Sequence, residues 1–313
     1  MEKNLMANER AIKNRINATK NIRQITKAME AVAAVKMRKS EQAALATRPY
    51  ALAALQILKN LSGVANWRID TDLATLSPLL IERSIKKIAL TVVTSDKGLA
   101  GAFNSNVLRQ ADEFIKNAPN NIQVDIITVG KKAKSHFEYK SQNILKHFEG
   151  VGDLAELHET EPMAKFLAQL FSEEKTDQVV FIFTNFLSVL KQEVLTRTLL
   201  PFSEKTLEEI VKNTVPLRGR YSGIPNALGL TTDNLPYIFE PSPEQLLREL
   251  LPHLFYVETH QIILEANASE HSSRMVAMKN ASQNALELVE ELTLTYNKAR
   301  QTKITKELLE ISK

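Results

Sequence analysis

The sequence predicts an α/β fold: a long antiparallel coiled coil of the N- and C-terminal helices plus a central α/β domain with a mostly parallel sheet. Proline and glycine, which interrupt helices, are missing from both ends, since the first of them is Pro49 and the last is Pro252. Between them, β-branched apolar runs alternate with amphipathic segments. The expected domains are an N-terminal coiled-coil helix over residues 1–60, a globular body over 61–252 and a C-terminal coiled-coil helix over 253–313.

The N-terminal segment is predicted to form one continuous helix. At 1.5 Å per residue, residues 1–48 would extend roughly 70 Å. A compact domain cannot bury a rod of this length, so its apolar side needs a second helix. The apolar residues step by three and four, as in a coiled coil; they are Ile12, Ile16, Thr19, Ile22, Ile25, Met29 and Val32.

The C-terminal segment, residues 253–313, has the same spacing and is the expected partner helix. Because the two segments lie at opposite ends of the chain, antiparallel pairing is the natural arrangement within one molecule. The predicted contact residues are Met275, Met278, Ala281, Ala285, Leu288, Leu292 and Ala299, with Ile304, Leu308 and Ile311 in the last turns. Alanine at several of these positions lets the two backbones approach closely, at some loss of buried area.

Positive charge is concentrated in the N-terminal helix. Residues 1–48 hold eleven Lys or Arg against four Asp or Glu, a balance of +7, whereas the whole chain carries +4. A basic segment suggests an acidic partner, which could be nucleic acid, anionic lipid or an acidic protein ring. The ordinary alternative is a solvated helix face, because exposed Lys and Arg are common.

The body is predicted to contain three strands, over residues 85–96, 122–130 and 178–186, because each is an apolar run rich in β-branched residues that ends in turn residues. Two amphipathic helices are expected between them. The first covers 103–117 and would be capped by Asn104 or Ser105. The second covers 161–176, with Pro162 near its first turn. Residues 201–252 are rich in proline and predict an irregular return to the last helix.

The loop after the first strand, SDKGLAGAFN (95–104), invites an enzymatic interpretation, because a glycine-rich turn between strand and helix can cradle phosphate. It matches neither G-x-G-x-x-G nor the P-loop. Gly98 and Gly101 predict a tight turn against a close neighbour instead. No catalytic triad or carboxylate pair is recognisable elsewhere, so no catalytic site is expected.

Composition excludes further classes of site. The chain has no cysteine, which rules out disulfides, thiol catalysis and cysteine metal sites. The six histidines lack ligand spacing, so neither a metal nor a cofactor is expected. The first residues are polar and no apolar run approaches the length of a membrane span, which predicts a cytosolic or membrane-peripheral protein.

Five stretches resemble the gamma subunit of F-type ATP synthase. NIRQITKAMEAVAAVKMRKSEQA (21–43) is similar to that family's N-terminal helix, and TSDKGLAGAFNSN (94–106) to its strand-to-loop signature. YIFEPSPEQLL (237–247) resembles the lead-in to the C-terminal helix. ASEHSSRMVAMKNASQNA with TYNKARQTKITKELLEI (268–285 and 295–311) resembles that helix itself. The stretches cover both ends and the first part of the body, in the family's order.

The resemblance implies a rotor shaft. In the family, the paired terminal helices stand inside a ring of three alpha and three beta subunits, and the body sits on the membrane-embedded c-ring beside epsilon. Ion flow turns the shaft, which drives the catalytic beta subunits through their conformations. This chain would be a non-catalytic subunit of a proton-translocating ATP synthase, without nucleic acid. It would be peripheral to the cytoplasmic face of the bacterial plasma membrane and touch the membrane only through the complex.

The resemblance also assigns contact residues. Those expected to meet a beta subunit are Met29, Arg274, Gln301 and Thr305. The loop at the foot of the shaft is marked by Lys97, Gly98 and Gly101. On the residues alone, Met29 also fits a position that packs on the C-terminal helix, and Arg274 and Gln301 also fit solvated helix positions.

Two other functions remain open at this stage. A coiled-coil adaptor with a basic nucleic-acid- or protein-binding helix would explain the N-terminal segment, but it would not require the matched C-terminal helix. A nucleotide-binding α/β enzyme would explain the glycine loop. Co-purification with alpha and beta subunits separates the first from a rotor, and ATP binding or turnover by the purified chain separates the second.

Overall fold

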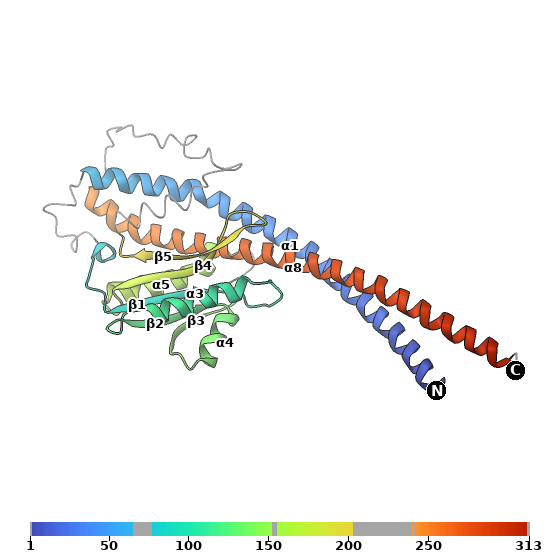
Figure 1. Ribbon diagram of the computed structural model, residues 1–313. Helices are drawn as coiled ribbons and strands as arrows, with labels where there is room; N and C mark the ends of the chain where they lie inside the picture. The colour runs from blue at the N-terminus through green and yellow to red at the C-terminus, as the bar shows by residue number, and fades with distance from the viewer. Residues whose placement is uncertain (1, 65–76, 152–154, 203–239, 241, 312–313) are drawn as a thin grey trace.

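The computed structural model describes residues 2–64, 77–151, 155–202, 240 and 242–311. Two long helices, α1 (Glu2–Val64) and α8 (Pro243–Ile311), run side by side in opposite directions and extend far beyond a globular body. Both termini lie at the far end of this projection (Figure 1). The predicted antiparallel pairing of the terminal helices is therefore confirmed.

The body is built on a five-stranded sheet with the order β3-β2-β1-β4-β5. Its strands are β1 (Lys87–Val93), β2 (Gln123–Val129), β3 (Ile144–Phe148), β4 (Gln178–Phe186) and β5 (Gln192–Leu200). The first four are parallel, and β5 pairs with β4 in the antiparallel sense. The mostly parallel sheet is confirmed, and β1, β2 and β4 are the three predicted strands.

Alternate residues of each strand enter different apolar layers, as the pleat of a strand requires. In β1, Ile88, Leu90 and Val92 pack beneath α3 (Phe103–Asn117) and α4 (Lys131–Tyr139). On the opposite face, Ala89 and Val93 pack with α5 (Leu157–Ser172) and with α8. A short 3-10 helix, η1 (Pro78–Leu80), adds two buried leucines to this second layer.

The contact line of α1 differs from the predicted one beyond Thr19. Ile22, Ile25 and Val32 are exposed to 53%, 60% and 55%. A coiled coil steps alternately by three and four, whereas the predicted line takes two steps of three after Thr19 and so turns away from the partner. Among the side chains of α1 that the structure describes, the buried ones are Ile16, Thr19, Ala33, Met37, Ser40 and Ala44.

The contact line of α8 agrees better with the prediction over most of its length. Met278 and Ala285 are buried, and the other predicted positions from 275 to 299 are half-buried. Near the tip, Ile304 and Leu308 are exposed, contrary to prediction, because the contact line there passes through Ala299 and Lys303. The side chain of Ile311 lies outside the described residues.

The C-terminal helix begins earlier than predicted. α8 starts at Pro243 and includes Pro252, whereas the sequence predicts an irregular segment up to that residue. An interior proline costs a helix about 3 kcal/mol. Burying one large apolar side chain contributes roughly 1.5–3 kcal/mol, and Leu251, Leu254 and Phe255 are all fully buried. Packing therefore outweighs the proline, while residues 203–239 and 241 of the predicted irregular segment lie outside the described residues.

The predicted helix over 161–176 also begins earlier, at Leu157. The Glu159 carboxylate accepts a hydrogen bond from the Glu156 N–H at 2.9 Å and so satisfies a group at the helix start. Pro162 consequently lies inside α5 rather than near its first turn.

Candidate functional site: the loops that hold the C-terminal helix

The loop that follows β1 caps the N-terminus of α4. The carboxylate of Asp96 accepts hydrogen bonds from the backbone N–H of Lys131 at 2.9 Å and of Gly150 at 3.4 Å. Thr94 Oγ1 accepts from the Ala133 N–H at 2.9 Å, and the Ser95 carbonyl accepts from the Lys132 N–H at 3.2 Å. These amides could otherwise bind an anion at a helix N-terminus. Because the chain itself occupies them, the geometry gives no support to phosphate binding here.

Gly130 permits this close approach between strand and helix. Its φ of +87° lies in the left-handed region, and a Cβ added there would come within 2.2 Å of the Thr94 carbonyl oxygen. No side chain fits in that space. The residue is therefore required by the junction that brings the ends of β1 and β2 together.

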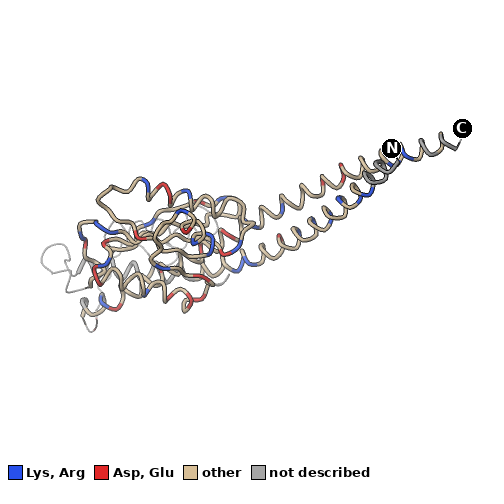
Figure 2. The backbone as a smooth tube through the Cα atoms, turned by 90° about the horizontal axis from the view of Figure 1, so that it is seen from below, with Lys and Arg blue, Asp and Glu red and all other residues tan. Residues whose placement is uncertain are grey.

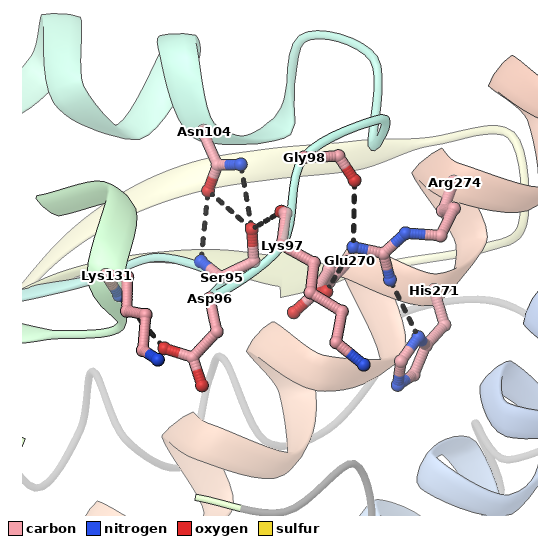
Figure 3. Close-up of polar contacts among 9 residues, drawn as sticks. All are labelled: Ser95, Asp96, Lys97, Gly98, Asn104, Lys131, Glu270, His271 and Arg274. Carbon is pink, nitrogen blue, oxygen red and sulfur yellow. Dashed lines mark hydrogen bonds and ion pairs between the residues drawn. The ribbon is translucent and has the colours of Figure 1, made fainter. Parts of the chain in front are cut away.

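A second set of hydrogen bonds fixes the loop after β1 to α3. The Asn104 side chain accepts from the Ser95 N–H at 3.0 Å and donates to Ser95 Oγ at 2.8 Å, while Ser95 Oγ donates to the Lys97 carbonyl at 2.6 Å (Figure 3). The predicted helix cap is thus wrong: α3 begins at Phe103, and Ala102 precedes it without a side-chain cap. Asn104 serves the loop instead, and Ser105 bonds to the Ala102 carbonyl.

The same loop reaches α8 through Arg274. Arg274 Nη2 donates to the Gly98 carbonyl at 3.3 Å and to Glu270 Oε1 at 2.6 Å (Figure 3). Arg274 Nη1 lies 3.3 Å from His271 Nδ1. Only 9% of Arg274 is exposed, so its guanidinium is engaged within the chain. The structure joins Arg274 to the foot loop, two features that the sequence assigns to separate contacts.

The foot-loop residues differ in what they contact. The Lys97 side chain is exposed. Gly101 has a φ of +56° and lies close to α8, since a Cβ added there would be 3.9 Å from Ala277 Cβ and from the Ser273 carbonyl. The predicted tight turn against a close neighbour is therefore present, and the neighbour is α8.

The β4–β5 hairpin holds the same turn of α8. Ser269 Oγ donates to the Thr184 carbonyl at 3.2 Å and Ser272 Oγ to the Val189 carbonyl at 2.7 Å. The Gln192 side chain donates to Ser272 Oγ at 3.3 Å and accepts from Ser273 Oγ at 3.2 Å. Sequence reasoning missed these contacts, although three serines within five residues of a long helix were a signal that polar neighbours surround it.

The other predicted contact residues lie elsewhere on the paired helices. Met29 is half-buried on α1. Gln301 and Thr305 are exposed toward the C-terminal end of α8, one turn apart, and Thr305 Oγ1 bonds only to the Gln301 carbonyl among the described residues. Gln301 and Thr305 therefore lie far along α8 from Arg274 and the foot loop.

A buried charge pair lies deeper in the body. Arg197 on β5 and Glu258 on α8 are 2% and 0% exposed and stand 3.9 Å apart. Burial raises the pKa of Glu258 to about 7, because Glu265 adds to the effect of desolvation while Arg197 only partly offsets it. Within the described residues, neither Glu258 oxygen has a hydrogen-bond partner. Sequence reasoning did not identify this pair.

The described residues offer neither a membrane span nor a metal site. None of the described helices has the length and apolar character that a membrane crossing needs. The described side chains include no group of three or more histidines and carboxylates arranged to hold a metal ion.

Known proteins resemble this chain in sequence and in fold. A sequence model of the ATP synthase family matches residues 8–313. The ATP synthase gamma chain of Cyanothece sp. is 38% identical over 313 residues, with 98% of each chain covered. That of Pelotomaculum thermopropionicum is 36% identical over 306 residues, covering 98% of this chain and 97% of the relative.

Solved structures with the same fold come from mitochondrial ATP synthases. A chain of the OSCP/F1/c-ring assembly of Euglena gracilis in rotational state 3 has a TM-score of 0.62 at 20% identity, covering 97% of this chain and 92% of that one. A chain of the central stalk and c-ring of Tetrahymena thermophila has a TM-score of 0.58 at 23% identity, covering 82% and 99%. With relatives at this identity along nearly its full length, the chain belongs to the ATP synthase gamma chain family.

Proposed function

We propose that this chain is the central rotor shaft of the F1 sector of an ATP synthase. It couples ion flow through the c-ring to the conformational cycle of the catalytic beta subunits and carries no catalytic site itself. The observation that carries this function is the antiparallel pair α1 and α8, which extends beyond the body as a slender projection (Figure 1). Nothing favours the adaptor or the nucleotide-binding enzyme.

The partners follow from this role. The alpha and beta subunits surround the projection, and the c-ring and epsilon contact the body. Lys and Arg recur along the projecting part of α1 (Figure 2), and Lys13, Lys20 and Lys27 are exposed. This favours guidance by acidic loops of the surrounding subunits over tight attachment. The contacts proposed with a beta subunit are Met29, Gln301 and Thr305. Lys97 is proposed to present its exposed ammonium group at the foot loop.

Arg274 needs a separate account as a proposed beta contact. Its guanidinium is already bonded to Gly98 and Glu270, so a beta subunit reaches it only at its small exposed fraction. An acidic group of the partner would then compete with Glu270 for the guanidinium. The proposed contact with a beta subunit would then lie next to the foot loop that bonds to Arg274.

We further propose protons as the coupling ion and the cytoplasmic face of a bacterial plasma membrane as the location. The relatives from Cyanothece sp. and Pelotomaculum thermopropionicum support a bacterial host. The ion is selected in the c-ring, so its test belongs to the whole complex. ATP synthesis by membrane vesicles should stop with a protonophore and continue with a sodium ionophore; the reverse result would assign sodium.

The rotor role is tested by shortening the shaft. Removing residues 1–20 together with 295–313 deletes the free end of the projection and leaves every element of the sheet in place. Coupled ATP synthesis by the reconstituted complex should fall severely, while the circular dichroism of the purified chain should retain the α/β body. Full coupled activity in the shortened variant would overturn the proposal.

A further inference from the structure

Two arms from the body hold one short segment of α8. The loop arm, residues 95–101, contacts Arg274, and the hairpin arm, residues 184–192, contacts Ser269, Ser272 and Ser273. We propose that these arms form a collar that fixes the rotational position of α8 and passes torque between body and shaft. This inference rests on the proposed rotor function and identifies where the body holds the shaft.

The arms bond to different sides of the helix. Successive residues of an α-helix lie about 100° apart around its axis. Ser269, Ser272 and Ser273 consequently share one face, and Arg274 lies about 100° beyond Ser273, which is the serine nearest to it around the axis. Turning α8 about its own axis in either direction therefore stretches the bonds of at least one arm.

Hydrogen bonds are suited to this task because they are directional, with strength that falls steeply as the angle is lost. Apolar burial, which surrounds α8 closer to the start of the helix, is non-directional. Apolar contacts alone keep α8 packed against the body, but they oppose rotation of the helix about its own axis less strongly. The polar contacts of the collar are therefore the ones that set the angle of the shaft.

The serines of the collar also bond in an unusual way for a helix. A helical serine commonly bonds back to a carbonyl of its own preceding turn. Thr293, Thr295, Thr302 and Thr305, farther along α8, have such bonds. Ser269 and Ser272 instead donate to carbonyl oxygens of Thr184 and Val189 on the body, so their hydroxyl groups connect two elements.

The collar is positioned to pass torque from the body to the shaft. α8 lies between α1 and the sheet, and the collar contacts it where the paired helices leave the body (Figure 1). The loop arm is itself fixed to α3 through Asn104 and to α4 through Asp96. Torque applied to the body thus reaches α8 through a supported loop.

The collar is tested with the double variant Gln192→Ala/Ser272→Ala, which removes three of the hairpin arm's bonds to α8 and leaves the bond from Ser269 to Thr184 in place. It also removes the bonds from Gln192 to the Ser188 and Val189 carbonyls within the hairpin. The control is Ser105→Ala/Gln169→Ala, which removes the same two side-chain types where each bonds only locally among the described residues. In both, Tyr139→Cys supplies one exposed attachment point for a rod, since the chain has no cysteine and Tyr139 is 90% exposed. All variants are assembled with the other F1 subunits.

Two measurements follow. In assembled complexes that are not turning over ATP, the alpha and beta subunits fix the shaft, and the rod reports the angle of the body. The spread of rod angles should be broader for the collar variant than for the control. Amide hydrogen exchange of residues 269–274 should be about tenfold faster, which corresponds to about 1.4 kcal/mol of lost protection and fits two or three hydrogen bonds. Exchange within the sheet should stay unchanged, which shows that the body is folded.

An equal angular spread in the two variants overturns the collar, and so does unchanged exchange at residues 269–274. A broader spread with faster local exchange supports it. Failure of the control to assemble with alpha and beta subunits, or to rotate on addition of ATP, counts against the rotor function itself and is distinguishable from either result.

Discussion

Gly130 stands at the residue where β2 turns into α4, and its backbone leaves no room for a side chain. Gly130→Ala should destabilise the chain by about 3 kcal/mol or more, because it adds a Cβ that collides with Thr94 as well as the cost of a left-handed residue. Gly150→Ala is the matched control, since it also has positive φ but open space around it. It should cost about 1 kcal/mol. Equal losses in urea unfolding would contradict the steric account.

At the same scale, the buried carboxyl of Glu258 makes stability depend on pH. The unfolded chain loses this proton near pH 4.5 and the folded chain near 7. Between those values the folded state holds the extra proton, so the free energy of unfolding falls as pH rises, and the loss is complete above the folded pKa. The full effect is about 3 kcal/mol.

Glu258→Gln should remove this dependence. The facing groups are Arg197 from β5 and Glu265 from α8, and both remain in the variant. Urea unfolding at pH 5 and pH 8 should show the variant gaining stability relative to the parent chain at the higher pH. The control Glu138→Gln replaces an exposed carboxylate and should change the free energy of unfolding by the same amount at pH 5 and at pH 8. If the free energy of unfolding of Glu258→Gln differs from that of the parent chain by the same amount at pH 5 and at pH 8, the buried Glu258 does not cause the pH dependence.

At the scale of elements, the sequence predicted those parts in which one local pattern determines the structure. β1, β2 and β4 are central strands buried on both faces, and their continuous apolar runs reveal them. β3 and β5 are edge strands with exposed polar residues, so ILKHF and QEVLTRTLL show no such run. α4 is short and highly charged, which hides its periodicity.

The candidate site was predictable only in pieces. The turn at Gly98 and Gly101 followed from local sequence, but the bond between Gly98 and Arg274 joins residues 176 positions apart. Helical periodicity does not report such a contact. The misplaced line on α1 has a related cause: Ile22, Ile25 and Val32 are apolar yet face outward, so hydrophobicity indicates two faces and only packing selects one.

The corrected contact line of α1 is tested with two alanines, Ala31 and Ala33, that lie two residues apart on different sides of the helix. Ala33 is 2% exposed in the contact with α8, whereas Ala31 is exposed. Ala33→Leu should destabilise the chain by about 1–3 kcal/mol through overpacking. Ala31→Leu should change stability by less than about 0.5 kcal/mol, because it adds its side chain to solvent. Thermal unfolding followed at 222 nm measures both, and a larger loss for Ala31→Leu than for Ala33→Leu would contradict the corrected contact line.

At the scale of the whole molecule, the outward apolar side chains of α1 separate folding from assembly. Ile25 and Val32 are more than half exposed, so the chain's own fold gains little from them. A surrounding partner would bury them, and each buried apolar side chain contributes roughly 1.5–3 kcal/mol. Ile25→Ser/Val32→Ser should therefore leave the free energy of unfolding of the isolated chain within about 0.5 kcal/mol of its original value.

The same variant should weaken association with the alpha and beta subunits. Titrating labelled chain into the other F1 subunits should show an affinity at least about tenfold lower for Ile25→Ser/Val32→Ser, equivalent to about 1.4 kcal/mol. The control Ala31→Ser lies on the exposed surface but removes little apolar area. If the two variants bind equally well, the outward face of α1 is not covered by the hexamer. If Ile25→Ser/Val32→Ser also unfolds more readily, those residues serve the chain's own core, and the separation of folding from assembly along α1 is wrong.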